Sequence, residues 1–150
     1  MVISSLFRWS TALSIRPDWD EYFLSLCRTV AQRADCTRRQ VGAVLVIDNR
    51  VVSTGYNGAP AGDAGCASAG ACPRGKLTYD QQPANVGYSG GGCIAIHAEH
   101  NAILYAYRDL SDATMYCTDE PCVDCERFIR GAKIKRVVTP SGARTLHYPR

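Results

Sequence analysis

The sequence has no long apolar run and carries little net charge. No apolar stretch approaches the ~20 residues that a membrane-spanning helix needs, so we expect no membrane contact. Residues 1–15 contain no continuous apolar core followed by a small-residue cleavage site, so we expect no secretory signal. The formal net charge of the 150 residues is only +3, too small to indicate nucleic-acid binding by itself. A chain of this charge would still tolerate an anionic small-molecule substrate.

Cysteine is the residue that the sequence has in excess, with eight in 150 residues. In a secreted chain, so many cysteines would suggest a disulfide framework. Because we expect no secretory signal, the favoured interpretation is a reducing cytoplasm in which metal ions hold several thiolates. Two of the eight, Cys27 and Cys117, lie within a predicted helix and a predicted strand, and we expect them in the core.

The patterns along the chain predict a single domain. Residues 1–16 show no clear period and are predicted to form an N-terminal extension to a domain over residues 17–150. Asp18, with Glu21 three residues later, predicts a capping box at the start of the first helix. The expected elements are a helix over 18–34, strands over 41–47 and 50–56, a helix over 96–109, a strand over 114–118, a helix over 122–132 and a strand over 134–139.

The order of these elements predicts an α/β fold with a mixed sheet sandwiched by helices. The strand over 41–47 is almost wholly apolar and β-branched, so we expect it to be covered on both faces. A turn at Asp48–Asn49 makes the next strand antiparallel to it. Residues 57–92 are rich in glycine and lack periodicity; a loop this long in a compact domain is uncommon and usually functional. The tail after residue 139 carries no assignment.

Two short motifs carry the predicted chemistry: His97-Ala98-Glu99 and Pro121-Cys122-Val123-Asp124-Cys125. We predict His97, Cys122 and Cys125 as three ligands of a catalytic zinc, which keeps its fourth position for water. Pro121 fits the first helical position, which puts both sulfurs at a helix N-terminus, where thiolates are favoured. Glu99 would take the proton of a zinc-activated water and pass it to the substrate.

The alternative is a structural zinc, closed by a fourth ligand such as His100. A lone CxxC pair is a weak signal, and a lone HxE is weaker still. However, H-x-E followed by P-C-x-x-C, with a glutamate that is not a ligand, is the signature of zinc deaminases that act on nucleobases. We therefore predict an enzyme in which water attacks an amidine-like carbon and ammonia leaves.

These motifs resemble the cytidine and deoxycytidylate deaminase superfamily. The resemblance covers roughly residues 20–140 and includes, besides both motifs, Val41–Val44 and Gly131–Ile134. The stretch Gly55–Gly62 narrows it to the deoxycytidylate (dCMP) deaminases and the related late-competence proteins. It implies a three-layer α-β-α fold with a five-strand mixed sheet. It also implies a zinc-dependent hydrolase that converts dCMP to dUMP and ammonia for thymidylate synthesis.

The resemblance further implies roles for residues around the zinc. Asn57 would bind the sugar, the Ala98 backbone N–H the pyrimidine carbonyl, and Glu99 the ring nitrogen and the departing amine. From the sequence alone, Asn57 is equally well explained as a turn residue before Gly58. Relatives of this type are often homo-oligomers, hexamers or dimers, which dCTP activates and dTTP inhibits. Their effector contacts would fall in the loop that contains Gly58 and Pro60.

A 5′-phosphate on the substrate needs cationic donors, and arginine matches phosphate geometry. Arg38 and Arg39 lie just before the first predicted strand and are the preferred candidates. Most charged side chains are simply solvated, so each candidate competes with a surface role. The other candidates are Arg33, Arg74, Lys76, Arg108 and Arg144.

Four further cysteines lie on predicted loops: Cys36, Cys66, Cys72 and Cys93. Some phage dCMP deaminases are similar here and hold a second, structural zinc with counterparts of Cys36 and Cys66. Cys93 falls near a further ligand of that zinc, and Cys72 would complete a set of four thiolates. Such a metal clip would order a glycine-rich loop that cannot bury enough surface to order itself. The alternatives are scattered thiols or a Cys66–Cys72 disulfide.

Other functions stay open at this point. The same chemistry could act on another nucleotide or on a tRNA adenosine, and Glu120 before Pro121 is compatible with adenosine editing. The small net charge and the lack of a basic stripe weigh against nucleic acid as a partner. A non-catalytic, zinc-stabilised assembly protein is an alternative of another class, and the intact Glu99 argues against it.

Overall fold

The computed structural model describes residues 16–74, 77, 81 and 92–149. Residues 1–15, most of the predicted extension, lie outside this part of the chain, so the boundary after residue 16 stays a prediction. Within the described residues, no helix has both the length and the apolar character needed to cross a membrane. The elements are α1 (Trp19–Ala31), β1 (Gly42–Ile47), β2 (Arg50–Tyr56), α2 (Ala98–Leu104), β3 (Thr114–Cys117), α3 (Val123–Gly131), β4 (Arg136–Thr139) and β5 (Gly142–Thr145).

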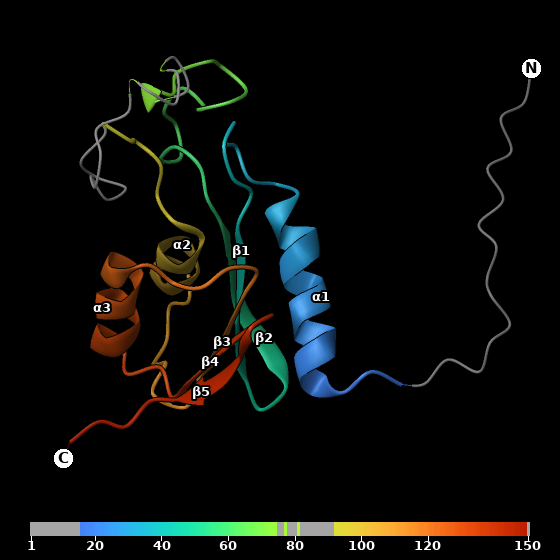
Figure 1. Cartoon of the computed structure of the whole chain (residues 1–150). Coiled ribbons are helices and arrows are strands. Elements are labelled where there is room, and N and C mark those ends of the chain that lie inside the picture. Colours follow the sequence, from blue (N-terminus) through green and yellow to red (C-terminus); the bar gives the residue numbers. More distant parts are fainter. Residues whose placement is uncertain (1–15, 75–76, 78–80, 82–91, 150) are drawn as a thin grey trace, which may run out of the picture.

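The strands form one five-stranded mixed sheet in the order β2-β1-β3-β4-β5. β1 pairs antiparallel with β2 and with β3, β3 runs parallel to β4, and β4 pairs antiparallel with β5. α1 covers one face of the sheet, while α2 and α3 cover the other (Figure 1). The predicted three-layer α-β-α fold is therefore confirmed.

β1 supplies side chains to two hydrophobic cores, one on each face of the sheet. Ala43 and Leu45 pack in the core beneath α2 and α3, whereas Val44 and Val46 pack in the core beneath α1. Successive strand residues point to opposite faces, so a strand buried on both sides needs an uninterrupted apolar run. The predicted burial of this strand is confirmed. The predicted hairpin is confirmed too, and its turn residues Asp48–Asn49 have φ angles of 50° and 56° that suit a tight turn.

α1 begins as predicted and ends early. Asp18 and Glu21 form the expected capping box, in which Asp18 Oδ1 accepts a hydrogen bond of 2.8 Å from the Glu21 N–H. The buried face of the helix consists of Phe23, Cys27 and Ala31. Ala31 is also the last helical residue, so the predicted end at residue 34 is wrong by one turn.

α2 is shorter than the helix predicted over 96–109, and α3 begins one residue later than predicted. His97 and Cys122 have extended backbones and are the N-cap residues of α2 and α3. Pro121 therefore lies before α3, and its predicted place as the first helical residue is wrong. α2 ends at Leu104, and Tyr107, with a left-handed φ of 52°, prevents the helix from continuing.

The fifth strand, β5, lies in the tail for which the sequence predicted nothing. Its residues are mostly exposed, and it pairs with β4 at the edge of the sheet. An exposed edge strand needs no apolar alternation, so hydrophobic periodicity provides no signal for it. β4 itself begins at Arg136, two residues later than predicted.

Two glycines let helices lie directly against the β1–β2 hairpin. At Gly55 of β2, a Cβ atom would overlap backbone atoms of Ala98 and Ala102 in α2. At Gly42 of β1, a Cβ atom would overlap backbone atoms of α1. β2 thus holds the start of α2, where the His97 motif lies, in close contact with the sheet.

Candidate metal centre and active site

The two predicted motifs meet where α2 and α3 begin. His97 Nδ1 lies 3.1 Å from Cys125 Sγ and 3.6 Å from Cys122 Sγ. The three ligand atoms lie within 4.8 Å of one another, and no other set of three His, Cys, Asp or Glu side chains among the described residues does so. Tetrahedral zinc bound by one imidazole and two thiolates places such atoms about 3.6 Å apart, so this donor set fits zinc.

His100, the alternative fourth ligand, does not join this group. Its ring stacks on that of His97, with centroids 5.2 Å apart, and packs against Phe128 at 4.1 Å. A group of three protein ligands leaves one coordination position for water, which is the difference between a catalytic and a closed structural zinc site.

Burial controls the protonation of the ligands. It lowers the pKa of His97 to about 4, and the neighbouring His100 adds to this shift. The imidazole is therefore neutral at physiological pH and can offer a lone pair to a metal. Burial also raises the pKa of the Cys125 thiol, and the Glu99 carboxyl raises it further. A bound metal ion reverses this effect, because a coordinating thiol is deprotonated outright.

Glu99 lies in the first turn of α2 beside the three-ligand group without being part of it. Its side chain is buried, with 4% of the residue exposed. Burial raises the pKa of its carboxyl group, and the charges of Asp119 and Glu126 raise it further. A raised pKa brings a carboxyl group closer to the pH at which an enzyme works, which favours general acid–base catalysis.

A cavity of about 50 Å³ opens onto this group. It brings together Asn57, Ala98 and Arg39, three of the four predicted substrate residues, with Glu99 and two of the three ligands. Its full lining is Arg39, Val41, Asn57, His97, Ala98, Glu99, Asp119, Glu120 and Cys122.

Asn57 faces this cavity and is almost fully buried, at 1% exposure. Its Oδ1 accepts a hydrogen bond of 2.8 Å from the Val41 N–H, and its Nδ2 donates one of 2.8 Å to the Arg39 carbonyl. The next residue, Gly58, bridges to Ile96 through two backbone hydrogen bonds of 3.2 and 2.8 Å. Asn57 therefore ties the segment before β1 to the end of β2, beside the site.

Only one of the two arginines predicted to bind phosphate lines the cavity. Arg39 lines the cavity, and its Nη2 lies 3.4 Å from Asp119 Oδ1. Arg38 does not line the cavity; its Nη1 donates to the Arg74 carbonyl at 3.4 Å. Lys76, another candidate, lies outside the described residues.

The four remaining loop cysteines gather around Cys66 without forming a compact ligand set. The Cys72 N–H donates to the Cys66 carbonyl at 3.4 Å. Burial raises the pKa of the Cys66 thiol, and Cys72, Cys93 and Cys36 raise it further. No three of their sulfur atoms, all within the described chain, lie within 4.8 Å of one another. The structure contains no disulfide among the eight cysteines, all of which it describes.

Cys27 and Cys117 are fully buried, as predicted for core residues.

Asp35 holds the loop that carries Cys66, because its carboxylate accepts hydrogen bonds of 2.9 and 2.8 Å from the Ala67 and Ser68 N–H groups.

The two residues predicted to contact effectors lie in a separate hollow. Gly58 and Pro60 line a depression of about 450 Å³ together with Arg33, Asp35 and Tyr56. This depression does not share Asn57 or Glu99 with the active-site cavity.

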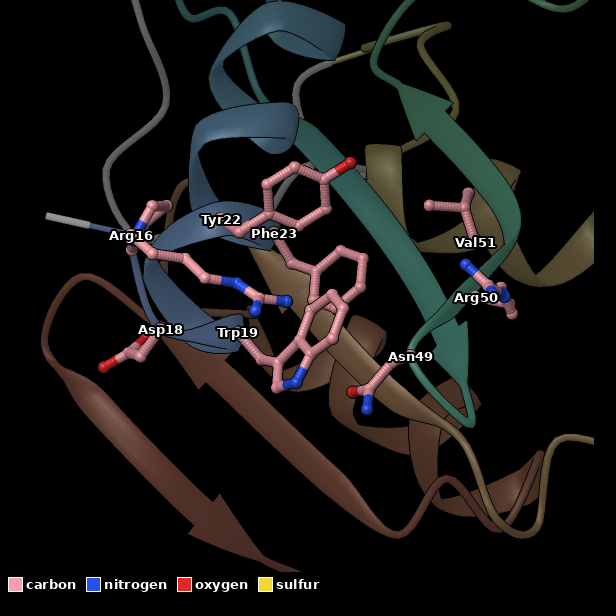
Figure 2. A pocket seen from close by; sticks show the side chains of 9 residues that line it. Arg16, Asp18, Trp19, Tyr22, Phe23, Asn49, Arg50 and Val51 are labelled. Carbon is pink, nitrogen blue, oxygen red and sulfur yellow. The ribbon is translucent and has the colours of Figure 1, made fainter. Parts of the chain in front are cut away.

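A larger hollow, of about 710 Å³, lies at the other end of β1 and contains none of the predicted site residues. Figure 2 shows Trp19, Tyr22 and Phe23 of α1 on one side of it, and Arg50 and Val51 of β2 on the other. The active-site cavity adjoins the residue before β1, whereas this hollow adjoins the turn after it. Its size alone therefore does not connect it with the chemistry of His97 and Glu99.

Asp119 and Val41 are cavity residues that the sequence did not single out. Asp119 follows β3 and precedes the Pro121-Cys122 motif by two residues, so its position beside a predicted ligand was the available signal. Its partner Arg39 is far away along the chain, and only the fold reveals their pairing.

Comparisons with known proteins match the domain as a whole. A family model described as the cytidine and deoxycytidylate deaminase zinc-binding region matches residues 17–141. The deoxycytidylate deaminase of Mycobacterium phage D29 is 54% identical over 128 residues, which cover 83% of this chain and 96% of that protein. The deoxycytidylate deaminase of Schizosaccharomyces pombe is 41% identical over 125 residues, which cover 82% of this chain and 37% of that protein.

The fold also matches a solved structure, that of the dCMP deaminase from cyanophage S-TIM5 in complex with dCMP and dUMP. The TM-score is 0.62 at 24% sequence identity, over 84% of this chain and 83% of that one. The chain thus spans nearly the whole of the Mycobacterium phage relative but little more than a third of the yeast relative.

Proposed function

Because the chain belongs to the cytidine and deoxycytidylate deaminase family, we propose that it is a zinc-dependent enzyme that hydrolyses dCMP to dUMP and ammonia. One observation carries the proposal: the open group of His97, Cys122 and Cys125 has the buried carboxyl of Glu99 beside it. The name of the phage relative, a deoxycytidylate deaminase at 54% identity, supports dCMP as the substrate.

The residues of the cavity have distinct roles in this reaction. Zinc held by His97, Cys122 and Cys125 would lower the pKa of a bound water to about 7 and so supply the nucleophile. Glu99 transfers one proton of the attacking water to ring nitrogen N3 and the other to the amine. The new C4–O bond remains, and the bond between C4 and the exocyclic amine nitrogen breaks to release ammonia. The raised pKa of Glu99 suits both transfers.

The rest of the cavity would hold the nucleotide. The Ala98 backbone N–H donates to the pyrimidine carbonyl, and Asn57 binds the sugar through the hydrogen-bonding capacity that Val41 and Arg39 leave. Arg39 binds the 5′-phosphate, because it lines the cavity and can form paired hydrogen bonds with phosphate oxygens. Arg38 directs its guanidinium to the Arg74 carbonyl and is the weaker candidate.

A second, structural zinc held by Cys36, Cys66, Cys72 and Cys93 is also part of the proposal. Two observations support it: the Cys72 N–H donates to the Cys66 carbonyl at 3.4 Å, and Cys72, Cys93 and Cys36 all contribute to the raised pKa of the Cys66 thiol. Four thiolates in a reducing cytoplasm would close around a zinc ion and draw the sulfur atoms together. By resemblance to its relatives, the chain would act as a homo-oligomer regulated by dCTP and dTTP, with effector contacts at the depression lined by Gly58 and Pro60.

Ammonia release from a panel of substrates tests the proposed function. The purified protein would be incubated with dCMP, CMP, dCTP, deoxycytidine and a tRNA adenosine substrate. We expect the highest kcat/KM with dCMP. Release of ammonia from another member of the panel but not from dCMP would overturn the proposed substrate, and release from none would favour an assembly protein instead.

A further inference from the structure

An ion pair lies at the mouth of the active-site cavity. Arg39 Nη2 is 3.4 Å from Asp119 Oδ1, and both residues line the cavity beside Glu99. The Arg39 side chain is 66% exposed and that of Asp119 is 28% exposed, so the pair lies between the cavity and solvent.

The position of the Arg39 guanidinium determines how the cavity receives an anion. Among the described residues that line the cavity, Arg39 is the only lysine or arginine, whereas Glu99, Asp119 and Glu120 all carry carboxyl groups. A phosphate would meet an acidic surface unless this one guanidinium pointed toward it. Arginine has a long side chain with many rotamers, and an exposed one is not held by packing.

Hydrogen bonds anchor both partners of the ion pair to the sheet. Asn57 Nδ2 donates to the Arg39 carbonyl at 2.8 Å, which holds the Arg39 backbone. Thr118 Oγ1 donates to Asp119 Oδ2 at 2.9 Å and accepts from the Gly42 N–H at 3.1 Å. The Asp119 carboxylate is therefore a fixed point at the start of β1, and the guanidinium is the group that it orients.

We propose that Asp119 is a positioning residue for substrate recognition: it holds the Arg39 guanidinium at the cavity mouth, ready to bind the 5′-phosphate of a nucleotide. This inference rests on the proposed function and deepens it. One nitrogen of the guanidinium faces Asp119, which leaves the remaining N–H groups of the fork for phosphate oxygens. Holding the side chain in place before binding reduces the ordering that the substrate would otherwise have to impose.

The test compares Asp119→Asn, Arg39→Gln and the double variant, with dCMP as substrate. Immobilising one rotamer-rich side chain corresponds to roughly a two- to tenfold change in affinity, so Asp119→Asn should raise the KM for dCMP by about that factor. The kcat should change less than KM, because the group that Asp119 positions does not touch the reacting atoms, and the pKa of Glu99 is raised chiefly by burial rather than by the charge of Asp119. Arg39→Gln should raise KM at least as much, and adding Asp119→Asn to it should cause no further increase.

Inhibition by dUMP and by deoxyuridine supplies a second measurement, since these molecules differ only in the phosphate. Asp119→Asn should weaken inhibition by dUMP more than inhibition by deoxyuridine. The matched control is Asp112→Asn, which breaks an exposed ion pair with Lys135, 4.0 Å long, away from the cavity. It should leave KM and both inhibition constants at their wild-type values.

Three results would overturn the inference. The KM for dCMP could fall in Asp119→Asn, which would mean that the carboxylate repels the phosphate. The effects of the two substitutions could add in the double variant, which would mean that Asp119 acts independently of Arg39. Inhibition by dUMP and deoxyuridine could weaken equally, which would indicate a purely structural role. Failure of the wild-type protein to deaminate dCMP would instead refute the proposed function itself.

Discussion

The Gly55→Ala substitution is expected to displace α2 from β2 and to disturb the candidate site with it. Gly55 does not need a left-handed backbone, so alanine introduces no conformational strain of its own. Its Cβ would overlap the carbonyl oxygen of Ala98 and the nitrogen of Ala102, which are backbone atoms that cannot rotate away. α2 must therefore shift, and His97 and Glu99 at its start shift with it.

The size of the effect follows from the cost of overpacking, which is about 1–3 kcal/mol for one extra buried group. In a domain of this size, 1 kcal/mol lowers Tm by roughly 2–4 °C, so we expect Gly55→Ala to lower Tm by roughly 2–12 °C. Misplacing a catalytic group by about 1 Å can cost on the order of 10²-fold in rate, and we expect kcat/KM for dCMP to fall by that order.

Gly131→Ala is the matched control for this substitution. Gly131 is the last residue of α3, and a Cβ there meets no atom within 4 Å. Calorimetry, zinc analysis and dCMP kinetics would be performed on both variants. Gly131→Ala should retain the Tm and activity of the wild type. If Gly55→Ala retained them as well, the close α2–β2 contact would not be what positions the site.

Two further predictions concern stability and metal content. Asp20→Asn should cost about 1–2 kcal/mol at neutral pH, because Arg136 loses a bidentate partner at 2.8 and 2.6 Å in a place that solvent partly screens. Arg136 holds the pKa of Asp20 below its usual 3.8, so this contribution is present above that pH and disappears as pH falls through the lower folded-state value. Urea unfolding at neutral pH, and again below the folded-state pKa of Asp20, measures this contribution. Equal stability of variant and wild type at neutral pH would contradict the prediction. Cys66→Ser should reduce bound zinc from two ions per chain to one; a single wild-type ion that survives the change would rule out the second site.

Features that depend only on residues close together along the chain could be predicted from the sequence. The Asp18 capping box is a local hydrogen-bonding pattern, and the doubly buried β1 strand follows from its uninterrupted apolar run. The end of α2 and the edge strand β5 could not be predicted in the same way. Tyr107, three residues after the last residue of α2, prevents the helix from continuing through its left-handed backbone, and β5 pairs through backbone groups that leave no hydrophobic period.

The same distinction applies to the candidate site: some of its features follow from the local sequence, and others depend on the fold. The residue types and spacing of a zinc centre restrict its ligands strongly, so the sequence could indicate that His97, Cys122 and Cys125 would meet. It could not distinguish Arg38 from Arg39, because the direction of each side chain depends on how the chain enters β1. Nor could it pair Arg39 with Asp119, since that contact exists only after β1 and β3 lie side by side.

The most direct test of the central claim is the activity and zinc content of Glu99→Gln. The amide cannot exchange protons with the attacking water, so dCMP deamination should fall by at least about 10²-fold, while the three ligands keep their zinc. Glu21→Gln is the matched control, because glutamine also completes the α1 capping box far from the site, and it should retain full activity. A Glu99→Gln protein that keeps its zinc and deaminates dCMP at the wild-type rate would contradict the assigned role of Glu99.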